Sequence, residues 1–160
     1  MNRYIGNIVP EPNTIFVFGS NPEGRHGAGA AKVAREKFGA IYGKGEGPQG
    51  NAYAIPTKDL RVKENNGYRS IPRETIIESI RKFYKYAIKH PNLNFKIAYN
   101  NKENEKTLNG YDGFEMLLMF HQASAEYNYN IPENVFFSTN WWTMYYTHIK
   151  PGEKEERDHD

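Results

Sequence analysis

Three side chains beside glycine-rich stretches could do chemistry, namely Asn21, His26 and Asp59. An asparagine amide can bind a ribose hydroxyl or orient a water molecule, and it can also cap its own loop in an Asx turn. An imidazole titrates near neutral pH, so His26 is a candidate general base or diphosphate contact, with a solvated loop histidine as the alternative. Asp59 follows a predicted strand and could activate water there, or it could be an ordinary turn residue. These three residues are the candidate catalytic groups.

The stretch that holds Asn21 and His26 predicts an anion site. Residues 14–18 are apolar or β-branched and uncharged, which is typical of a strand buried on both faces. Small residues from about Ala28 onward favour a helix packed closely against a sheet. Four glycines follow the strand and reach into the start of the helix: Gly19, Gly24, Gly27 and Gly29. A helix N-terminus behind glycines exposes unpaired N–H groups that suit a phosphate or a diphosphate, whereas the alternative is a tight turn with no ligand.

A second glycine cluster, residues 39–50, is predicted to be an irregular loop that either faces the same cleft or forms simple structural turns. It has the letters of a dinucleotide-binding motif, but a strand follows where a helix is needed, and Pro48 interrupts it. Arg25 is a candidate phosphate partner or a surface residue. The full set of candidate ligand-binding residues is Gly19, Ser20, Asn21, Arg25, His26, Gly27, Ala28, Gly29, Ala30, Gly45, Gly47, Thr57, Gly110 and Tyr111.

The composition gives no indication of a nucleic-acid-binding, metal-binding or membrane-spanning protein. The 160 residues carry 21 basic and 19 acidic side chains, a net charge of +2 that gives no argument for a nucleic-acid partner. No cysteine is present, and the five histidines lack zinc-ligand spacing, so we expect no metal site and no cofactor. No apolar stretch is long enough to span a membrane, and we expect a cytoplasmic protein without a signal peptide.

Predicted strands alternate with predicted helices along the chain. We expect strands at 14–18, 51–57, 94–99 and 134–139, and helices from Ala28, over 72–90 and over 113–127. This order predicts an α/β fold, a three-layer α/β/α sandwich with a mixed, mostly parallel sheet. The loop after the first strand and the long polar loop 100–112 should then meet at the carboxyl ends of the strands, where such folds bind ligands. Residues 1–150 are expected to form one domain, and the charged residues 151–160 a disordered tail.

Several motifs resemble those of macrodomain-like proteins. They are Phe18-Gly-Ser-Asn21, Gly24-Arg-His-Gly-Ala-Gly-Ala-Ala31, Gly43-Lys-Gly-Glu-Gly-Pro-Gln-Gly50 and Tyr53-Ala-Ile-Pro-Thr-Lys-Asp59. More narrowly, they resemble a small bacterial and phage-encoded branch of that fold. The chain departs from the family in its longer, partly acidic loop at 100–110, and it has no tandem glutamate like that of the glycohydrolase branch.

The resemblance implies an ADP-ribose-type nucleotide as ligand, and hydrolysis of ADP-ribosyl linkages as an accompanying activity. It implies that Asn21 contacts the distal ribose, that the backbone of residues 27–30 holds the diphosphate, and that a loop around residues 100–111 closes over it. Two alternatives stay open. One is a non-catalytic, phage-encoded protein that sequesters a nucleotide signal. The other is a protein-interaction factor with a vestigial pocket, whose contact surface is the aromatic segment Trp141–Tyr146.

Overall fold

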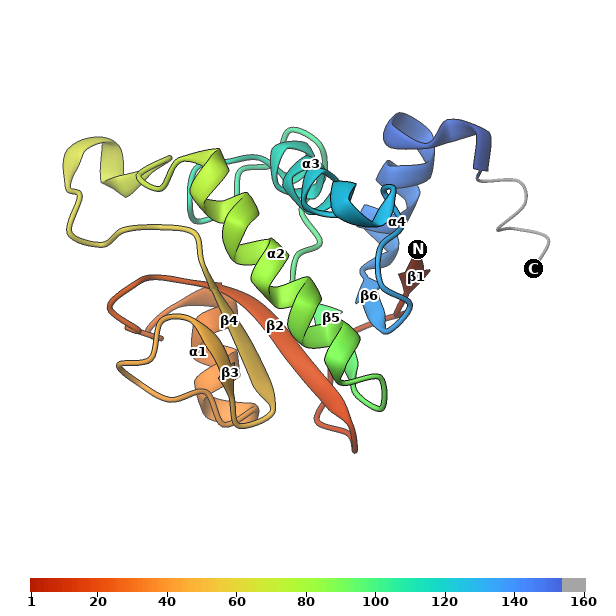
Figure 1. Ribbon diagram of the computed structural model, residues 1–160. Helices are drawn as coiled ribbons and strands as arrows, with labels where there is room; N and C mark the ends of the chain where they lie inside the picture. The colour runs from red at the N-terminus through yellow and green to blue at the C-terminus, as the bar shows by residue number, and fades with distance from the viewer. Residues whose placement is uncertain (154–160) are drawn as a thin grey trace.

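The computed structural model describes residues 1–153, and a six-stranded sheet forms its centre (Figure 1). The strand order is β1-β6-β5-β2-β4-β3, and every neighbouring pair is parallel except β3 with β4. The strands are β1 (Asn2–Arg3), β2 (Thr14–Ser20), β3 (Gly47–Gln49), β4 (Ala52–Pro56), β5 (Asn94–Ile97) and β6 (Val135–Phe137). The mixed, mostly parallel sheet expected from the sequence is confirmed.

Four α-helices pack on this sheet, α1 on one face and α2 to α4 on the other. The helices are α1 (Gly29–Lys37), α2 (Arg73–Lys89), α3 (Gly113–Ala123) and α4 (Thr139–Met144). Short helical turns are η1 (Glu64–Gly67), η2 (Ala125–Tyr127), η3 (Tyr145–Ile149) and η4 (Pro151–Glu153). The arrangement is consistent with a three-layer sandwich.

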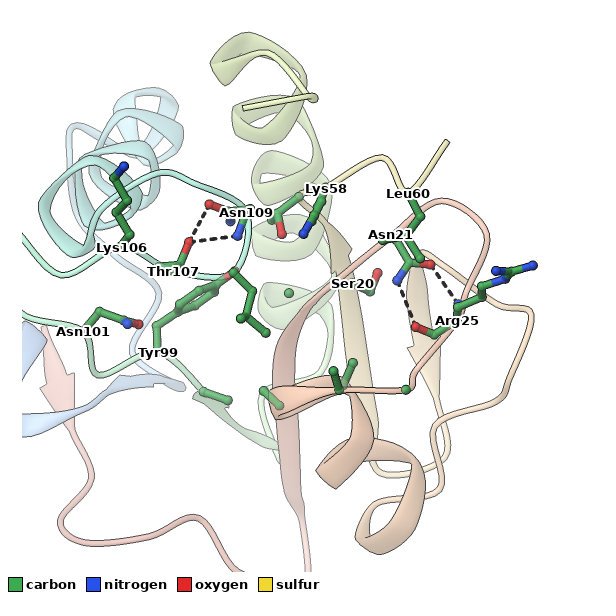
Figure 2. A pocket seen from close by; sticks show the side chains of 18 residues that line it. Ser20, Asn21, Arg25, Lys58, Leu60, Tyr99, Asn101, Lys106, Thr107 and Asn109 are labelled. Carbon is green, nitrogen blue, oxygen red and sulfur yellow. Dashed lines mark hydrogen bonds between the residues drawn. The ribbon is translucent and has the colours of Figure 1, made fainter. Parts of the chain in front are cut away.

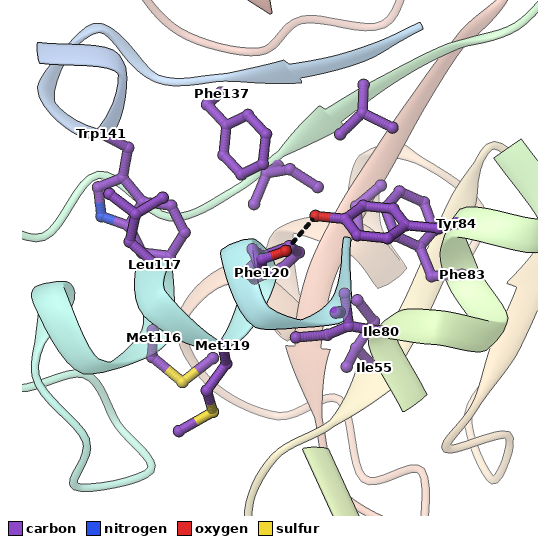
Figure 3. Packing of buried hydrophobic residues seen from close by; sticks show 14 of the residues in the cluster. Ile55, Ile80, Phe83, Tyr84, Met116, Leu117, Met119, Phe120, Phe137 and Trp141 are labelled. Carbon is purple, nitrogen blue, oxygen red and sulfur yellow. Dashed lines mark hydrogen bonds between the residues drawn. The ribbon is translucent and has the colours of Figure 1, made fainter. Parts of the chain in front are cut away.

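The alternation of side chains along the strands produces the two layers of core. In β2, Phe16 and Phe18 pack with Ala31 and Ala34 of α1, because successive residues of a strand point to opposite faces. The intervening residues of the same strand point into the larger core beneath α2, α3 and α4. There the hydroxyl of Tyr84 in α2 donates a 2.8 Å hydrogen bond to the carbonyl of Phe120 in α3 (Figure 3). This bond satisfies a buried polar group and ties the two helices together.

The aromatic segment after β6 is part of the core. Trp141 is fully buried, and Trp142, Tyr145 and Tyr146 are each at most 6% exposed. Trp141 stacks on Phe137 and packs edge-on to Phe120 (Figure 3). These side chains therefore offer no exposed contact surface, which argues against the protein-interaction alternative.

The ends of some predicted elements differ from the structure. The helix expected over 113–127 ends at Ala123, and the second glycine cluster, expected to be irregular, contains the short strand β3. Of the tail predicted to be disordered, Pro151–Glu153 form the turn η4, and residues 154–160 lie outside the described residues. None of the described helices combines the length and the apolar character needed to cross a membrane.

Candidate functional site

The topology produces a crevice between β2 and β5. The connection after β2 runs through α1 to β4, and the connection after β5 runs through α3 toward β6 on the other side. Because α1 and α3 cover opposite faces, the chain leaves these two neighbouring strands in opposite directions. In open α/β sheets ligands bind at such a switch point, outside the carboxyl ends of the strands.

A cavity of about 500 Å³ lies at this point (Figure 2). It brings together eight of the candidate ligand-binding residues: Gly19, Ser20, Asn21, Arg25, Gly27, Ala28, Ala30 and Thr57. The expected meeting of the loop after β2 with the loop after β5 is confirmed, since residues of both line the cavity. A volume of this size falls in the range of small-molecule sites.

Other lining residues were not among the candidates. They are Ala31, Lys58, Leu60, Ala98, Tyr99, Asn101, Lys106, Thr107, Leu108 and Asn109. Half of them follow the carboxyl ends of β4 and β5 within four residues, namely Lys58, Leu60, Ala98, Tyr99 and Asn101. The strand-end rule that placed the loop 100–112 at this edge could have selected Lys58 and Tyr99 as well.

The N-terminus of α1 faces the cavity without a side-chain cap. Its N-cap is Ala28, whose methyl group accepts no hydrogen bond, and the first turn has no acidic residue. The neighbouring residues Gly27, Ala30 and Ala31 line the cavity with small side chains or none. The unpaired N–H groups and the partial positive charge of the helix end are therefore accessible to an anion.

The side chain of Asn21 is engaged in its own loop. Its Nδ2 donates to the carbonyl of Arg25 at 2.9 Å, and its Oδ1 accepts from the Arg25 N–H at 2.8 Å (Figure 2). This is the loop-capping alternative considered for Asn21. An amide has a second donor and further acceptor capacity, so Asn21 can still contact a ligand while it holds the loop.

His26 does not line the cavity. Its side chain is fully buried, packs edge-on to Phe18, and places Nε2 at 3.1 Å from the Lys44 carbonyl and 3.2 Å from Gln49 Oε1. Since both partners are oxygen acceptors, Nε2 donates to them, and Nδ1 is buried with no hydrogen-bond partner among residues 1–153. This arrangement fixes the first glycine loop to the second cluster.

The second glycine cluster packs against the first glycine loop. The Ser20 hydroxyl donates to the Gly45 carbonyl, and a side chain at Gly45 would overlap the carbonyls of Asn21 and Pro22. Neither Gly45 nor Gly47 lines the cavity, and Gly47 pairs with β4 as part of β3. The cluster therefore provides the structural turns that were the alternative to a ligand contact.

Asp59 also lies outside the cavity lining. Its carboxylate accepts three hydrogen bonds of 3.0 Å from Arg61, two from the guanidinium group and one from the backbone N–H. These bonds lower the pKa of Asp59 to about 2. Arg61 Nε also lies 3.0 Å from the carboxylate of Glu23 in the first glycine loop. Asp59 is thus ionised and paired to an arginine at the surface.

Tyr99 extends into the floor of the cavity beside Gly19. Its ring stacks on Trp141, with centroids 5.3 Å apart and planes 7° apart. Burial raises the pKa of Tyr99 to about 12, and hydrogen bonds with the side chains of Thr57 and Asn109 partly oppose that rise. At neutral pH the Tyr99 hydroxyl is therefore protonated and can donate to a ligand oxygen.

The loop after β5 is held by its own hydrogen bonds. Thr107 Oγ1 lies 2.5 Å from Asn109 Oδ1, and Trp141 Nε1 donates to the Asn101 carbonyl at 2.9 Å. Leu108, which is 65% exposed, reaches across to α1, where a Cβ at Gly29 would lie 2.7 Å from its Cδ1. The loop thus extends to the N-terminus of α1.

Three predicted contacts of these loops lie away from the cavity. Gly29 is not among its lining residues, although Leu108 packs against it. Gly110 packs on Tyr68, with no space for a side chain between them. The buried Tyr111 donates its hydroxyl to the Ile71 carbonyl at 2.8 Å. Gly110 and Tyr111 therefore fix the loop to the segment before α2.

The cavity is positively charged although the chain is nearly neutral. Its described lining includes Arg25, Lys58 and Lys106 but no carboxylate and no histidine. Within residues 1–153 no group of three or more potential metal ligands comes together. The lining therefore favours an anionic ligand.

No protein-family model matches this chain, and a search of curated protein sequences finds no similar protein.

Proposed function

We propose that this protein binds an ADP-ribose-type nucleotide, with the diphosphate at the N-terminus of α1. The observation that carries the proposal is the uncapped N-terminus of α1, which opens into a cavity with three cationic lining residues and no described carboxylate. Backbone N–H groups at a helix N-terminus bind phosphate oxygens, and Arg25 can add a charge-assisted hydrogen bond. The likeness of the glycine-rich motifs to those of macrodomain-like proteins is what favours ADP-ribose over other diphosphates.

The remaining lining suits the neutral parts of such a nucleotide. Asn21 and Tyr99 offer hydrogen-bonding groups for ribose hydroxyls, and Leu60 and Leu108 offer apolar surface for a base. Ligand sites commonly combine apolar walls with a few placed polar groups.

We propose that the protein binds this nucleotide without hydrolysing it rapidly. Hydrolysis of an ADP-ribosyl bond needs a group that activates water, and the candidates His26 and Asp59 both lie outside the cavity lining. Tyr99 keeps its proton at neutral pH and so acts as a donor rather than a base. A protein that retains its nucleotide, as a sequestering module does, fits this lining best.

Calorimetric titration with ADP-ribose, cyclic ADP-ribose and NAD tests the proposal. We expect binding of ADP-ribose, and a loss of about tenfold in affinity in Arg25→Gln. Arg35→Gln is the matched control, because Arg35 lies in the last turn of α1, away from the cavity. Absence of binding for all three nucleotides contradicts the proposal, and release of product over several hours contradicts the non-catalytic part.

A further inference from the structure

The floor of the cavity is supported by a residue that does not line it. Trp141 in α4 is fully buried and is not among the lining residues. Its indole ring stacks on the ring of Tyr99, with centroids 5.3 Å apart and planes 7° apart. Tyr99 itself lines the cavity (Figure 2). The position of one lining side chain therefore depends on a contact with Trp141.

The same indole also holds the backbone that follows Tyr99. Its Nε1 donates a 2.9 Å hydrogen bond to the carbonyl of Asn101, another lining residue. The preceding residue of α4, Asn140, donates from Nδ2 to the carbonyl of Asn100 at 2.9 Å. Two successive side chains of α4 thus bind two successive carbonyls of the loop after β5.

The start of α3 packs against this part of the loop as well. A side chain at Gly113 would overlap the carbonyls of Asn101 and Lys102. The Asn101 carbonyl is therefore enclosed by protein, and its hydrogen bond to Trp141 is partly buried. An enclosed carbonyl that loses its donor costs free energy, so the loop should depend on the indole N–H.

Core side chains hold Trp141 in turn. Its ring stacks on Phe137 of β6 and packs edge-on to Phe120 of α3 (Figure 3). Its backbone N–H donates to the hydroxyl of Ser138, the N-cap of α4. Because protein interiors are close-packed, a ring enclosed in this way keeps one orientation. Trp141 is thus a rigid support for the cavity residues that it contacts.

We infer that Trp141 is a positioning residue of the cavity, which fixes Tyr99 by stacking and the loop after β5 by its hydrogen bond to Asn101. The inference rests on the proposed function and deepens it, because it names a residue that acts on the ligand through two lining residues. A site that is already ordered binds more tightly than one that must become ordered on binding, so loss of this support should weaken binding.

Trp142 offers a matched control in the same helix. It is 6% exposed, and its Nε1 also donates to a backbone carbonyl, that of Met1, at 3.1 Å. Its ring packs edge-on to Tyr146, and it is not among the residues that line the cavity. Trp141→Phe and Trp142→Phe therefore remove the same N–H donor while each keeps an aromatic ring.

The first test follows the indole N–H signals of the unsubstituted protein by NMR while ADP-ribose is added. The chain has two tryptophans, so two signals are expected, and Trp142→Phe assigns them. We expect the Trp141 signal to shift on binding, because its acceptor and its stacking partner both line the site. The Trp142 signal should stay in place. An unchanged Trp141 signal, with binding shown by calorimetry, contradicts the inference and leaves the proposed function standing.

The second test measures amide hydrogen exchange without ligand. In Trp141→Phe the amides of residues 101–109 should exchange about fivefold faster than in the unsubstituted protein. The affinity for ADP-ribose should fall by a similar factor of about five. In Trp142→Phe both quantities should stay within about twofold. Slow exchange of the α2 amides in both variants shows that they are folded.

Two results of this comparison overturn the inference. One is equal exchange of residues 101–109 in Trp141→Phe and Trp142→Phe. The other is an equal loss of affinity in the two variants, which would reflect a general effect on α4. Absence of ADP-ribose binding to the unsubstituted protein overturns the proposed function, and with it the role of Trp141 toward a ligand, whatever the exchange rates are.

Discussion

The Tyr99 hydroxyl occupies the space next to Gly19 where a side chain would otherwise lie. A Cβ at position 19 would overlap the Tyr99 oxygen and come within 3.1 Å of Thr57 Oγ1. Gly19 is the sixth residue of the central strand β2, and Tyr99 follows the neighbouring strand β5. The absence of a side chain in one strand thus allows the next strand to place a hydroxyl on the floor of the cavity.

This relationship predicts a coupled pair of substitutions. Gly19→Ala should lower the free energy of unfolding by about 1–3 kcal/mol, because the added methyl group has no space beside Tyr99. Tyr99→Phe in the same chain should recover part of that loss, since it removes the overlapping oxygen. Urea denaturation of the two single variants and the double variant measures the coupling.

Gly27→Ala is the control for that experiment. A Cβ at Gly27 has no other atom within 4 Å, and Gly27 is not among the glycines with positive φ. We expect a change in stability within about 0.5 kcal/mol. Strictly additive effects of Gly19→Ala and Tyr99→Phe would contradict the proposed overlap.

Tyr99 should make the protein sensitive to alkaline pH. Its pKa is about 12 in the folded protein, compared with 10.0 for an unperturbed tyrosine. The folded state therefore holds this proton where the unfolded chain loses it, so the contribution to stability is complete below pH 10 and is lost as the pH rises toward 12. Tyr99→Phe should show a shallower fall of stability over this range in denaturation curves. The other tyrosines are present in both the unsubstituted protein and the Tyr99→Phe variant, so they affect the pH dependence of both equally. Identical slopes of stability against pH in the two proteins would contradict the raised pKa of Tyr99.

His26 should matter for stability rather than for proton transfer. His26→Ala removes a fully buried ring and its contacts with Lys44 and Gln49, so we expect a loss of about 2–4 kcal/mol in the free energy of unfolding. His148→Ala is the matched control, because His148 is exposed, pairs with Glu103 at the surface and has one edge-on ring contact with Phe114. It should change stability by less than about 1 kcal/mol. An unchanged stability of His26→Ala together with loss of a measured hydrolytic activity would instead support a catalytic role.

Asp59 should titrate at unusually low pH. Its hydrogen bonds with Arg61 lower the pKa of its carboxyl to about 2, from 3.8. Any stability from this pair is present above pH 3.8 and is lost as the pH falls toward 2. Carboxyl-carbon NMR should give a midpoint near 2, and Arg61→Gln should move that midpoint upward. Asp59→Asn should leave nucleotide affinity unchanged, and a large loss of affinity would place Asp59 in the site after all.

Local patterns along the chain determine much of this protein. The uncharged run at 14–18 identifies β2, the glycines after it identify the turn into α1, and the alternation of strands and helices predicts the mixed, mostly parallel sheet. The meeting of the loops after β2 and β5 also follows from the sequence, because parallel strands place their carboxyl ends at one edge. These properties depend on residues close together in the chain or on general rules of sheet topology.

Only the tertiary structure decides which side chains reach the cavity. His26 and Asp59 have suitable chemistry and lie near the glycine loop in sequence, yet one is buried against Gln49 and the other is bound by Arg61. Tyr99 and Lys106 reach the cavity from a strand end and a loop about 80 residues beyond the glycine loop. Residue type sets what a side chain can do. Packing between distant segments determines where that side chain points and which partner it already has. No local pattern in the sequence predicts either property.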